Sequence, residues 1–230
     1  MSAADVLGLL RGGLVVSCQA PAGHPLRDPG VIAALAECAV LGGAAGLRIN
    51  SPADIRAVRR GTALPVIGLH KVRHGHRDVI TPSLELAAGL AEAGADVIAI
   101  DLTPESPAHG PELVAAVRDE LGRPVMADVS TLEEGLAAWG AGADVVGTTL
   151  SGYTARQLPP PDDPDIELVA ALAARGVRVV AEGRYRTEDQ VRRAFDAGAW
   201  AVVVGSAITD PVAITARLRA ATPRALDEPR

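Results

Sequence analysis

The feature that most constrains the fold of this chain is a series of eight short apolar runs, separated by stretches with helical periodicity. Each run is four to six residues long, is rich in valine and isoleucine, and does not alternate strictly between apolar and polar residues. Strands that are covered on both faces have this pattern, as in parallel sheets. The runs span residues 14–17, 46–49, 65–69, 96–101, 124–128, 144–149, 177–182 and 200–205.

The stretches between the runs carry signals for helix starts and helix ends. A capping-box pattern begins two of the expected helices, at Thr131 and at Thr187. In three places a glycine ends the expected helix and a strand follows at once, within EAGADVIAI, GAGADVVGT and DAGAWAVVV. Six further helices are predicted to start where a capping residue precedes a proline, at Asp28-Pro29, Ser51-Pro52, Thr81-Pro82, Gly110-Pro111, Asp163-Pro164 and Asp210-Pro211.

Eight strand–helix units in 230 residues predict an α/β protein, a (β/α)₈ barrel formed by one domain over residues 1–230. The alternative is an open, doubly wound sheet, but eight regular units favour closure. Two segments are long enough to lie over the mouth of such a barrel. They are the proline-rich stretch 154–164 and the stretch 72–78, VRHGHRD.

Composition excludes several classes of protein. The net charge of −6 argues against a large nucleic-acid surface. No run of about 18 apolar residues is present, so we expect no membrane span. The two cysteines predict neither a disulfide framework nor a metal cluster. Because the N-terminus also lacks a signal-peptide pattern, we expect a cytoplasmic protein.

The barrel prediction decides where chemistry should be sought, because the active site of this fold lies where the C-terminal ends of the strands meet. Nearly all residues at those ends are polar. Any one of them has an ordinary alternative explanation as a point where the chain meets solvent. As a set they converge on one pocket, and they are Gln19, Arg48, Lys71, Asp101, Asp128, Thr148, Glu182, Gly205 and Ser206.

The last two of these ends suggest a phosphate site. Barrels of this class often hold phosphate with the loops after strands seven and eight. Here those loops read Glu182-Gly183-Arg184 and Gly205-Ser206. A glycine lets backbone N–H groups approach an anion, although both glycines could also serve only to make tight turns. We therefore predict a barrel of the phosphate-binding type.

Lys71 has three possible roles after the third run. It could form a Schiff base, act as a general base with a pKa lowered by burial or by cationic neighbours, or merely pair with a carboxylate. Glu182 and Asp128 are the candidate acidic partners. A base and an acid beside a sugar phosphate predict removal of a proton next to a carbonyl group.

Seven segments together resemble the N-acylmannosamine-6-phosphate 2-epimerase family, in order, from about residue 12 to about residue 215. They are GLVVSCQ (13–19), PVIGLHK (65–71), GADVIAID (94–101), MADVST (126–131), GTTLSGYT (147–154), VVAEGRY (179–185) and WAVVVGSAIT (200–209). The resemblance implies a (β/α)₈ barrel of bacterial sialic-acid catabolism. It also implies interconversion of N-acetylmannosamine 6-phosphate and N-acetylglucosamine 6-phosphate, no metal, no organic cofactor, and a homodimer.

The resemblance also implies roles for individual residues. Lys71 matches the catalytic lysine that handles the C2 proton, and Glu182 matches its acidic partner. Arg184 either steers the anion or lies on the rim. The residues that match those holding the sugar, its N-acyl group or the phosphate are Gln19, Arg48, Asp128, Gly183, Gly205 and Ser206.

Two departures from the family pattern affect the substrate more than the reaction class. Asp210 stands where members usually carry an arginine, so we expect its carboxylate to turn away from the phosphate. After Lys71 the chain carries Arg73, His74, His76 and Arg77, which either replace that positive charge or form a solvated basic loop. The alternative functions are a Schiff-base aldolase, a ketose–aldose isomerase, and a regulator that binds a sugar phosphate without catalysis.

Overall fold

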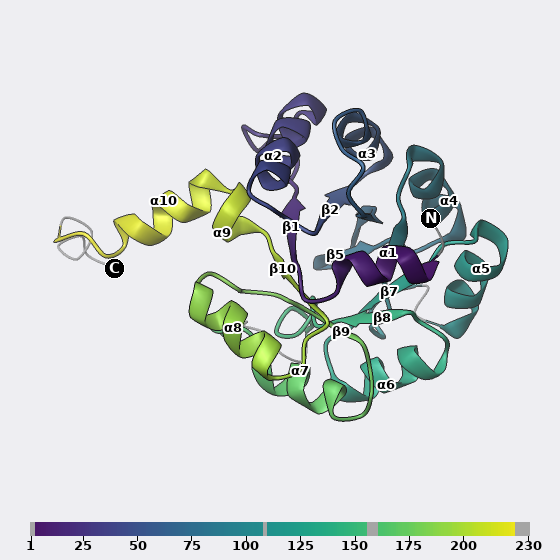
Figure 1. Cartoon of the computed structure of the whole chain (residues 1–230). Coiled ribbons are helices and arrows are strands. Elements are labelled where there is room, and N and C mark those ends of the chain that lie inside the picture. The colour runs from purple at the N-terminus through teal and green to yellow at the C-terminus, as the bar shows by residue number, and fades with distance from the viewer. Residues whose placement is uncertain (1–2, 108–109, 156–160, 224–230) are drawn as a thin grey trace.

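The computed structural model describes residues 3–107, 110–155 and 161–223, and within them eight parallel strands close into a barrel. The predicted (β/α)₈ barrel is therefore confirmed (Figure 1). Each strand hydrogen-bonds to its two neighbours, and β10 pairs with β1 to close the sheet. In order around the barrel the strands are β1 (Leu14–Cys18), β2 (Gly46–Asn50), β3 (Val66–Leu69), β6 (Val97–Asp101), β7 (Val125–Asp128), β8 (Val145–Gly147), β9 (Val179–Glu182) and β10 (Ala201–Val204).

Helices surround the barrel as the alternating sequence pattern predicts (Figure 1). Their buried faces are rich in alanine, valine and leucine, which explains how a chain with only 2% aromatic residues fills its outer layer. The helices packed around the sheet are α2 (Pro29–Leu41), α3 (Pro52–Arg59), α4 (Leu84–Ala93), α5 (Pro111–Leu121), α6 (Leu132–Gly140), α7 (Ile166–Ala173) and α8 (Glu188–Asp196).

Most of the predicted helix starts are confirmed, and two are wrong by two residues. Asp28, Ser51, Gly110 and Asp210 occupy N-cap positions, and both capping boxes are complete. The N-cap of α4, however, is Ser83 and not Thr81.

The second error concerns the start of α7, where the N-cap is Asp165 and not Asp163. Asp165 accepts a hydrogen bond from the Leu168 N–H at 2.9 Å. The carboxylate of Asp163 is engaged elsewhere, because it accepts from the side-chain amide of Gln190 at 3.0 Å. The predicted long segment 154–164 contains residues 156–160, which lie outside the described residues.

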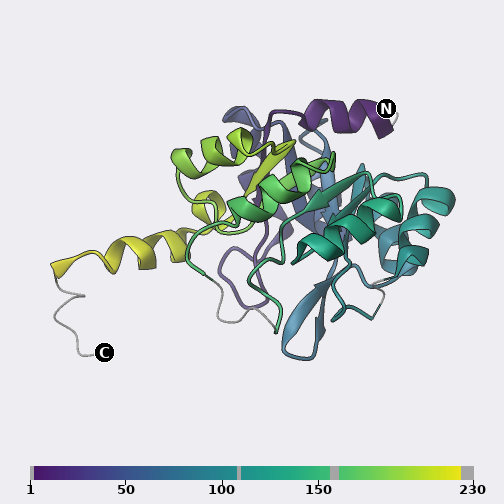
Figure 2. The ribbon, with the colours of Figure 1, turned by 90° about the horizontal axis from the view of Figure 1, so that it is seen from below.

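The N-terminal helix α1 (Ala3–Leu10) seals one end of the barrel, opposite the mouth (Figure 2). Val6, Leu7 and Leu10 are buried and join the cluster inside the barrel. This inner cluster includes Ile67 and Val203, and it is distinct from the outer cluster between strands and helices. The apolar plug leaves the opposite end for the polar strand ends.

The stretch 72–78 was predicted as a loop over the mouth, but it is part of a β-hairpin. Strands β4 (Lys71–His74) and β5 (Arg77–Ile80) pair antiparallel, with Lys71 opposite Ile80. The turn places Gly75 at φ 58°, a left-handed conformation that favours glycine. The hairpin extends from the end of the barrel opposite α1 (Figure 2). It therefore lies at the mouth, as predicted, but with a fixed register.

The C-terminal part of the described chain leaves the barrel. After the short helix α9 (Ser206–Thr209), helix α10 (Pro211–Arg219) projects outward (Figures 1 and 2). None of its residues is buried, and Val212 and Leu218 are 57% and 62% exposed. In the part of the chain that the structure describes, no helix is long and apolar enough to cross a membrane.

Candidate active site

A cavity of about 560 Å³ opens at the mouth of the barrel. Seven of the nine predicted site residues line it, and the two others, Arg48 and Asp128, are buried beneath it at 1% and 0% exposure. The hairpin supplies one wall through His76, Arg77 and Asp78. The seven predicted lining residues are Gln19, Lys71, Glu182, Gly183, Arg184, Gly205 and Ser206.

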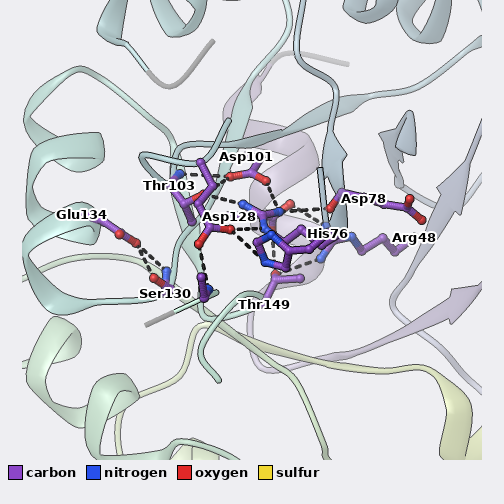
Figure 3. A network of polar contacts seen from close by, with 12 residues as sticks. Arg48, His76, Asp78, Asp101, Thr103, Asp128, Ser130, Glu134 and Thr149 are labelled. Atoms are coloured by element: carbon purple, nitrogen blue, oxygen red, sulfur yellow. Dashed lines mark hydrogen bonds and ion pairs between the residues drawn. The ribbon is translucent and has the colours of Figure 1, made fainter. Parts of the chain in front are cut away.

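Arg48 is the centre of the polar network beneath the cavity (Figure 3). Its Nη2 donates to Oδ2 of Asp128 at 2.6 Å, and its Nη1 donates to Oε2 of Glu182. These three side chains come from β2, β7 and β9, so the closed barrel alone brings them together. A fully buried guanidinium requires such paired carboxylates, since an unpaired buried charge is costly. Burial raises the pKa of Asp128, and the Arg48 guanidinium opposes that shift only in part.

Thr149 completes this network and is a functional candidate that the sequence analysis missed. Its hydroxyl accepts from Arg48 at 3.0 Å and also contacts the carboxylates of Asp128 and Glu182. The strand pattern indicates the neighbouring Thr148 instead, but its hydroxyl accepts from the backbone N–H of Glu182 and donates to its C=O. The GTTLSGYT segment holds both threonines, but the pattern does not show which one faces Asp128.

Lys71 begins β4 and lines the cavity, where its side chain is accessible to a ligand. The side chain of Asn50, at the end of β2, accepts a hydrogen bond from the Lys71 backbone N–H at 2.9 Å and fixes its position. Lys71 remains exposed to solvent at the mouth, but the protein groups crowded around it disfavour its charged form and lower its pKa, and the Arg48 guanidinium lowers it further. Asp78 and Asp128 act in the opposite direction without reversing the shift. The amine is thus more readily neutral than that of a free lysine.

Glu182 ends β9 and has one oxygen committed to the network and one available. Oε2 accepts from Arg48 and lies 3.3 Å from the Thr149 hydroxyl. Among the described residues, Oε1 makes no hydrogen bond, and the side chain is 14% exposed where it lines the cavity. The buried network therefore fixes one oxygen of this carboxylate, and the other oxygen is available to a ligand in the cavity.

The two glycine loops lie at the same cavity, as predicted, and their geometry is tight. Gly183 has a φ of 109°, which a residue with a side chain rarely adopts. Gly205 precedes α9, and Thr209 anchors that helix by donating to the Ser17 carbonyl at 2.8 Å. Phosphate binding by these loops stays a prediction, with backbone N–H groups as the available donors.

Arg184 lines the cavity but is also tied to the loop after β8. Its Nε donates to the Asp163 carbonyl at 2.8 Å, and its Nη1 donates to the Ser151 carbonyl at 2.5 Å. Its guanidinium lies 5.4 Å from the centre of the Tyr153 ring. Arg184 therefore braces this loop, and a contact with a bound anion stays a prediction.

Asp210 lies on the cavity wall, and its carboxylate is already engaged. Oδ1 accepts from the Ala213 N–H at 3.0 Å and so caps α10. The same oxygen lies 3.5 Å from Nε2 of His24, a residue that the sequence analysis did not select. The expectation that the carboxylate avoids a bound phosphate stays a prediction.

The family model described as "Putative N-acetylmannosamine-6-phosphate epimerase", NanE, matches residues 32–224. A protein of Klebsiella pneumoniae subsp. pneumoniae named "Putative N-acetylmannosamine-6-phosphate 2-epimerase" is 50% identical over 200 residues, covering 86% of this chain and 84% of its own. A protein of Thermosynechococcus vestitus with the same name is 47% identical over 203 residues, covering 87% of this chain and 89% of its own.

A solved structure agrees with the sequence relatives. It is the N-acetylmannosamine-6-phosphate 2-epimerase from Clostridium perfringens, with a TM-score of 0.86 and 36% identity, covering 93% of this chain and 94% of that one. The family match extends over most of the chain and includes every residue that lines the cavity except Ser17 and Gln19, at the end of β1. This chain belongs to the NanE family.

Proposed function

We propose that this protein is an epimerase that interconverts N-acetylmannosamine 6-phosphate and N-acetylglucosamine 6-phosphate by removing and returning the proton at C2. The observation that carries the proposal is Lys71. It is the only lysine among 22 lysine and arginine residues, and it lies in the cavity with a lowered pKa. An arginine cannot give up its proton in a protein, whereas a lysine in such a site can serve as a base.

The reaction follows from the acidity of a proton next to a carbonyl group. Opening of the sugar ring produces an aldehyde at C1, which acidifies the C2 proton. The neutral Lys71 amine takes that proton, and the C2–H electron pair moves into an enolate. The new ammonium group lies beside the developing negative charge and stabilises it. Return of a proton to the opposite face of C2 inverts the configuration there.

Other cavity residues have groups suited to the rest of the substrate. Gln19 donates to the Ser17 hydroxyl at 2.7 Å, which leaves its buried Oε1 without a partner among the described residues. That oxygen suits the N–H of an N-acyl group. The N–H groups after Gly183 and Gly205 suit the phosphate, and Oε1 of Glu182 suits a sugar hydroxyl or the second proton transfer.

The test is incorporation of solvent deuterium at C2 of N-acetylmannosamine 6-phosphate, followed by NMR. The wild-type protein should exchange the C2 proton and form the epimer. Lys71→Ala should lower this rate by about 10² to 10⁴, the usual contribution of positioned proton transfer. A wild-type protein that neither exchanges the proton nor forms the epimer would disprove the proposal.

Glu182→Gln provides the second arm of the test. It keeps the shape of the side chain but removes a charge that faces Arg48. We expect turnover to fall by about tenfold or more, while the protein stays folded because Asp128 still pairs with the buried Arg48 guanidinium. If the variant unfolds instead, Glu182 serves the core and not the chemistry.

Treatment with substrate and borohydride separates this function from a Schiff-base aldolase. Because Lys71 is the only lysine, any covalent adduct on a lysine must appear on one peptide. We expect no such adduct with an epimerase that transfers protons only. Trapped substrate on Lys71 would favour the aldolase, and absence of any turnover with tight binding of the sugar phosphate would favour a regulator.

We also propose that the protein is a homodimer and that it is cytoplasmic. Helix α10 supports the dimer, because an isolated nine-residue helix with no buried residue is marginal in water and needs a partner surface. A second copy is the expected partner, since two-fold homodimers are the commonest oligomers. Cys18 and Cys38 are both free thiols, which supports a reducing compartment.

A further inference from the structure

We propose that Arg77, Asp101 and Glu105 form a clasp that holds the hairpin carrying Lys71 over the cavity, which makes Arg77 a positioning residue for the proposed epimerase. The catalytic role of this clasp rests on the proposed function. The contacts that form it are separate from those of the Arg48 network. Asp101 ends a strand, as the catalytic candidates do, but no role has yet been given to it.

The anchor of the clasp is Asp101, at the C-terminal end of β6. Its carboxylate is completely buried, and Oδ1 accepts from the backbone N–H of Thr103 at 3.0 Å and from the Thr103 hydroxyl at 2.6 Å. Figure 3 shows Asp101 and Thr103 beside each other at the strand ends. A buried carboxylate held this way has a fixed position and needs a positive partner.

Arg77 is that partner, and it comes from the hairpin. Nη1 donates to Oδ2 of Asp101 at 2.6 Å, Nη2 donates to the Thr103 hydroxyl at 2.6 Å, and Nε donates to Oε2 of Glu105 at 2.7 Å. The side chain is only 11% exposed. One planar guanidinium thus joins β5 to the segment after β6, which a flexible lysine could not match.

Glu105 extends the clasp to a second wall of the mouth. Its Oε1 accepts from the backbone N–H of Ala155 at 2.7 Å, in the loop after β8. His76, at the tip of the hairpin, lies 3.6 Å from Oε2. A single carboxylate therefore links the hairpin to the loop that begins with the Thr149 segment. Burial raises the pKa of Glu105, but the hydrogen bonds from Arg77 and Ala155 outweigh that effect and lower it.

The clasp holds the part of the hairpin near the turn, which the hydrogen bonds at its base do not reach. At the base, Asn50 accepts from the Lys71 N–H, and Thr81 exchanges two hydrogen bonds with His70. Arg77 lies six positions beyond Lys71, beside the turn, and its hydrogen bonds tie this part of the hairpin to the end of β6 and the segment after it. Without it the tip would swing away, admit water to the cavity and loosen the geometry around the Lys71 amine.

The sharpest test compares Arg77→Met with Arg73→Met. Both replace an arginine of the same hairpin, but Arg73 is 69% exposed, is not among the described residues that line the cavity, and forms a surface ion pair with Asp78 at 3.5 Å. We expect Arg77→Met to lower kcat for C2 proton exchange by about tenfold or more, since small misplacements of a catalytic group have effects of that order. Arg73→Met should stay within about twofold of the wild type.

The double variant Arg77→Met/Asp101→Asn keeps the test decisive if Arg77→Met folds poorly. It removes the buried charge that Arg77→Met alone leaves unpaired, so the fold should recover. The hairpin remains unfastened, so kcat should stay low. Full recovery of kcat in the double variant would overturn the proposal, because it would show that fastening is not needed.

Hydrogen exchange supplies a readout that does not depend on turnover. Backbone amides of residues 71–80 should exchange faster in Arg77→Met and in the double variant, while those of the barrel strands should not. Faster exchange throughout the barrel with unchanged kcat per folded molecule would overturn the proposal. A wild-type protein that fails to epimerise would remove the proposed function alone, since the exchange result would still test the clasp.

Discussion

At the scale of single residues, the site depends on how closely side chains from different strands approach. Gly147 shows this most clearly. A Cβ atom at this position would lie 2.9 Å from Oδ1 of Asp128 and 3.0 Å from the hydroxyl of Thr149, and it would overlap the Met126 methyl group. A glycine at the end of β8 is therefore required for the contact between Asp128 and Thr149 and, through it, for the position of Arg48.

Gly147→Ala should accordingly disturb the site without breaking the barrel. We expect a loss of stability of about 1–3 kcal/mol from overpacking and a clear fall in kcat, measured by denaturant unfolding and the C2 exchange assay. Gly140→Ala is the matched control, because a Cβ atom at Gly140, in the last turn of α6, meets nothing within 4 Å. It should keep full activity and gain up to about 1 kcal/mol from helix propensity.

The pKa of Lys71 is a second quantity that belongs to one residue. Lysine bases act when neutral, so kcat/KM should rise with pH through a pKa below the ordinary value of 10.5. Asp78→Asn should lower the midpoint further, because Asp78 favours the charged lysine. Reductive methylation gives one lysine NMR signal to titrate, and a midpoint at or above 10.5 would contradict this prediction.

At the scale of elements, a helix start could be predicted from the sequence only where the capping side chain was not engaged by another hydrogen-bond partner. The start of α2 at Asp28 was predictable because its carboxylate has the Gly30 and Val31 N–H groups as partners. The start of α4 was not, because the Thr81 hydroxyl accepts from the His70 N–H at 3.0 Å and closes the base of the hairpin. That pairing joins the residues that flank β4 and β5, two strands that the charged, histidine-rich segment did not indicate.

The hairpin and the clasp were missed for the same physical reason. Arginine and histidine are not strong strand formers, so residues 71–80 do not have the composition of a strand pair. Their order comes from tertiary contacts, namely the ion pairs of Arg77 with Asp101 and Glu105. Asp101 was predictable as a polar residue at a strand end. Its partner Arg77 was not predictable, because the two residues are 24 positions apart in the sequence.

Helix α1 allows a prediction about an element that plugs the barrel. Leu10 is completely buried at the base, whereas its neighbour Leu9 is 53% exposed. Leu10→Ala should lower the free energy of unfolding by about 2–5 kcal/mol, as for other leucines that leave a cavity in a core. Leu9→Ala should change it by about 0.5 kcal/mol at most. Equal effects of the two variants in urea unfolding would mean that α1 does not pack on the barrel in solution.

At the scale of the whole molecule, the closed barrel was predictable from the regular order of strand–helix units. The packing of the last helix was not. Each of the seven helices from α2 to α8 buries residues against its neighbours, whereas α10 buries none. The sequence gives no warning of this, because Asp210-Pro211 starts α10 as regularly as Asp28-Pro29 starts α2. Local capping chemistry determines where a helix begins but not which surface it packs on.

The proposed dimer can be tested through this helix. Val212 and Leu218 are both more than half exposed on α10, and burying them against a second copy would be favourable by about 1.5–3 kcal/mol per side chain. Val212→Glu/Leu218→Glu should therefore convert a dimer into a monomer, measured by light scattering coupled to size-exclusion chromatography. Leu9→Glu, on α1 and away from α10 (Figure 2), should leave the dimer intact. The wild-type unfolding temperature should also rise with protein concentration, since association stabilises the folded state, and a wild-type monomer at all concentrations would refute the dimer.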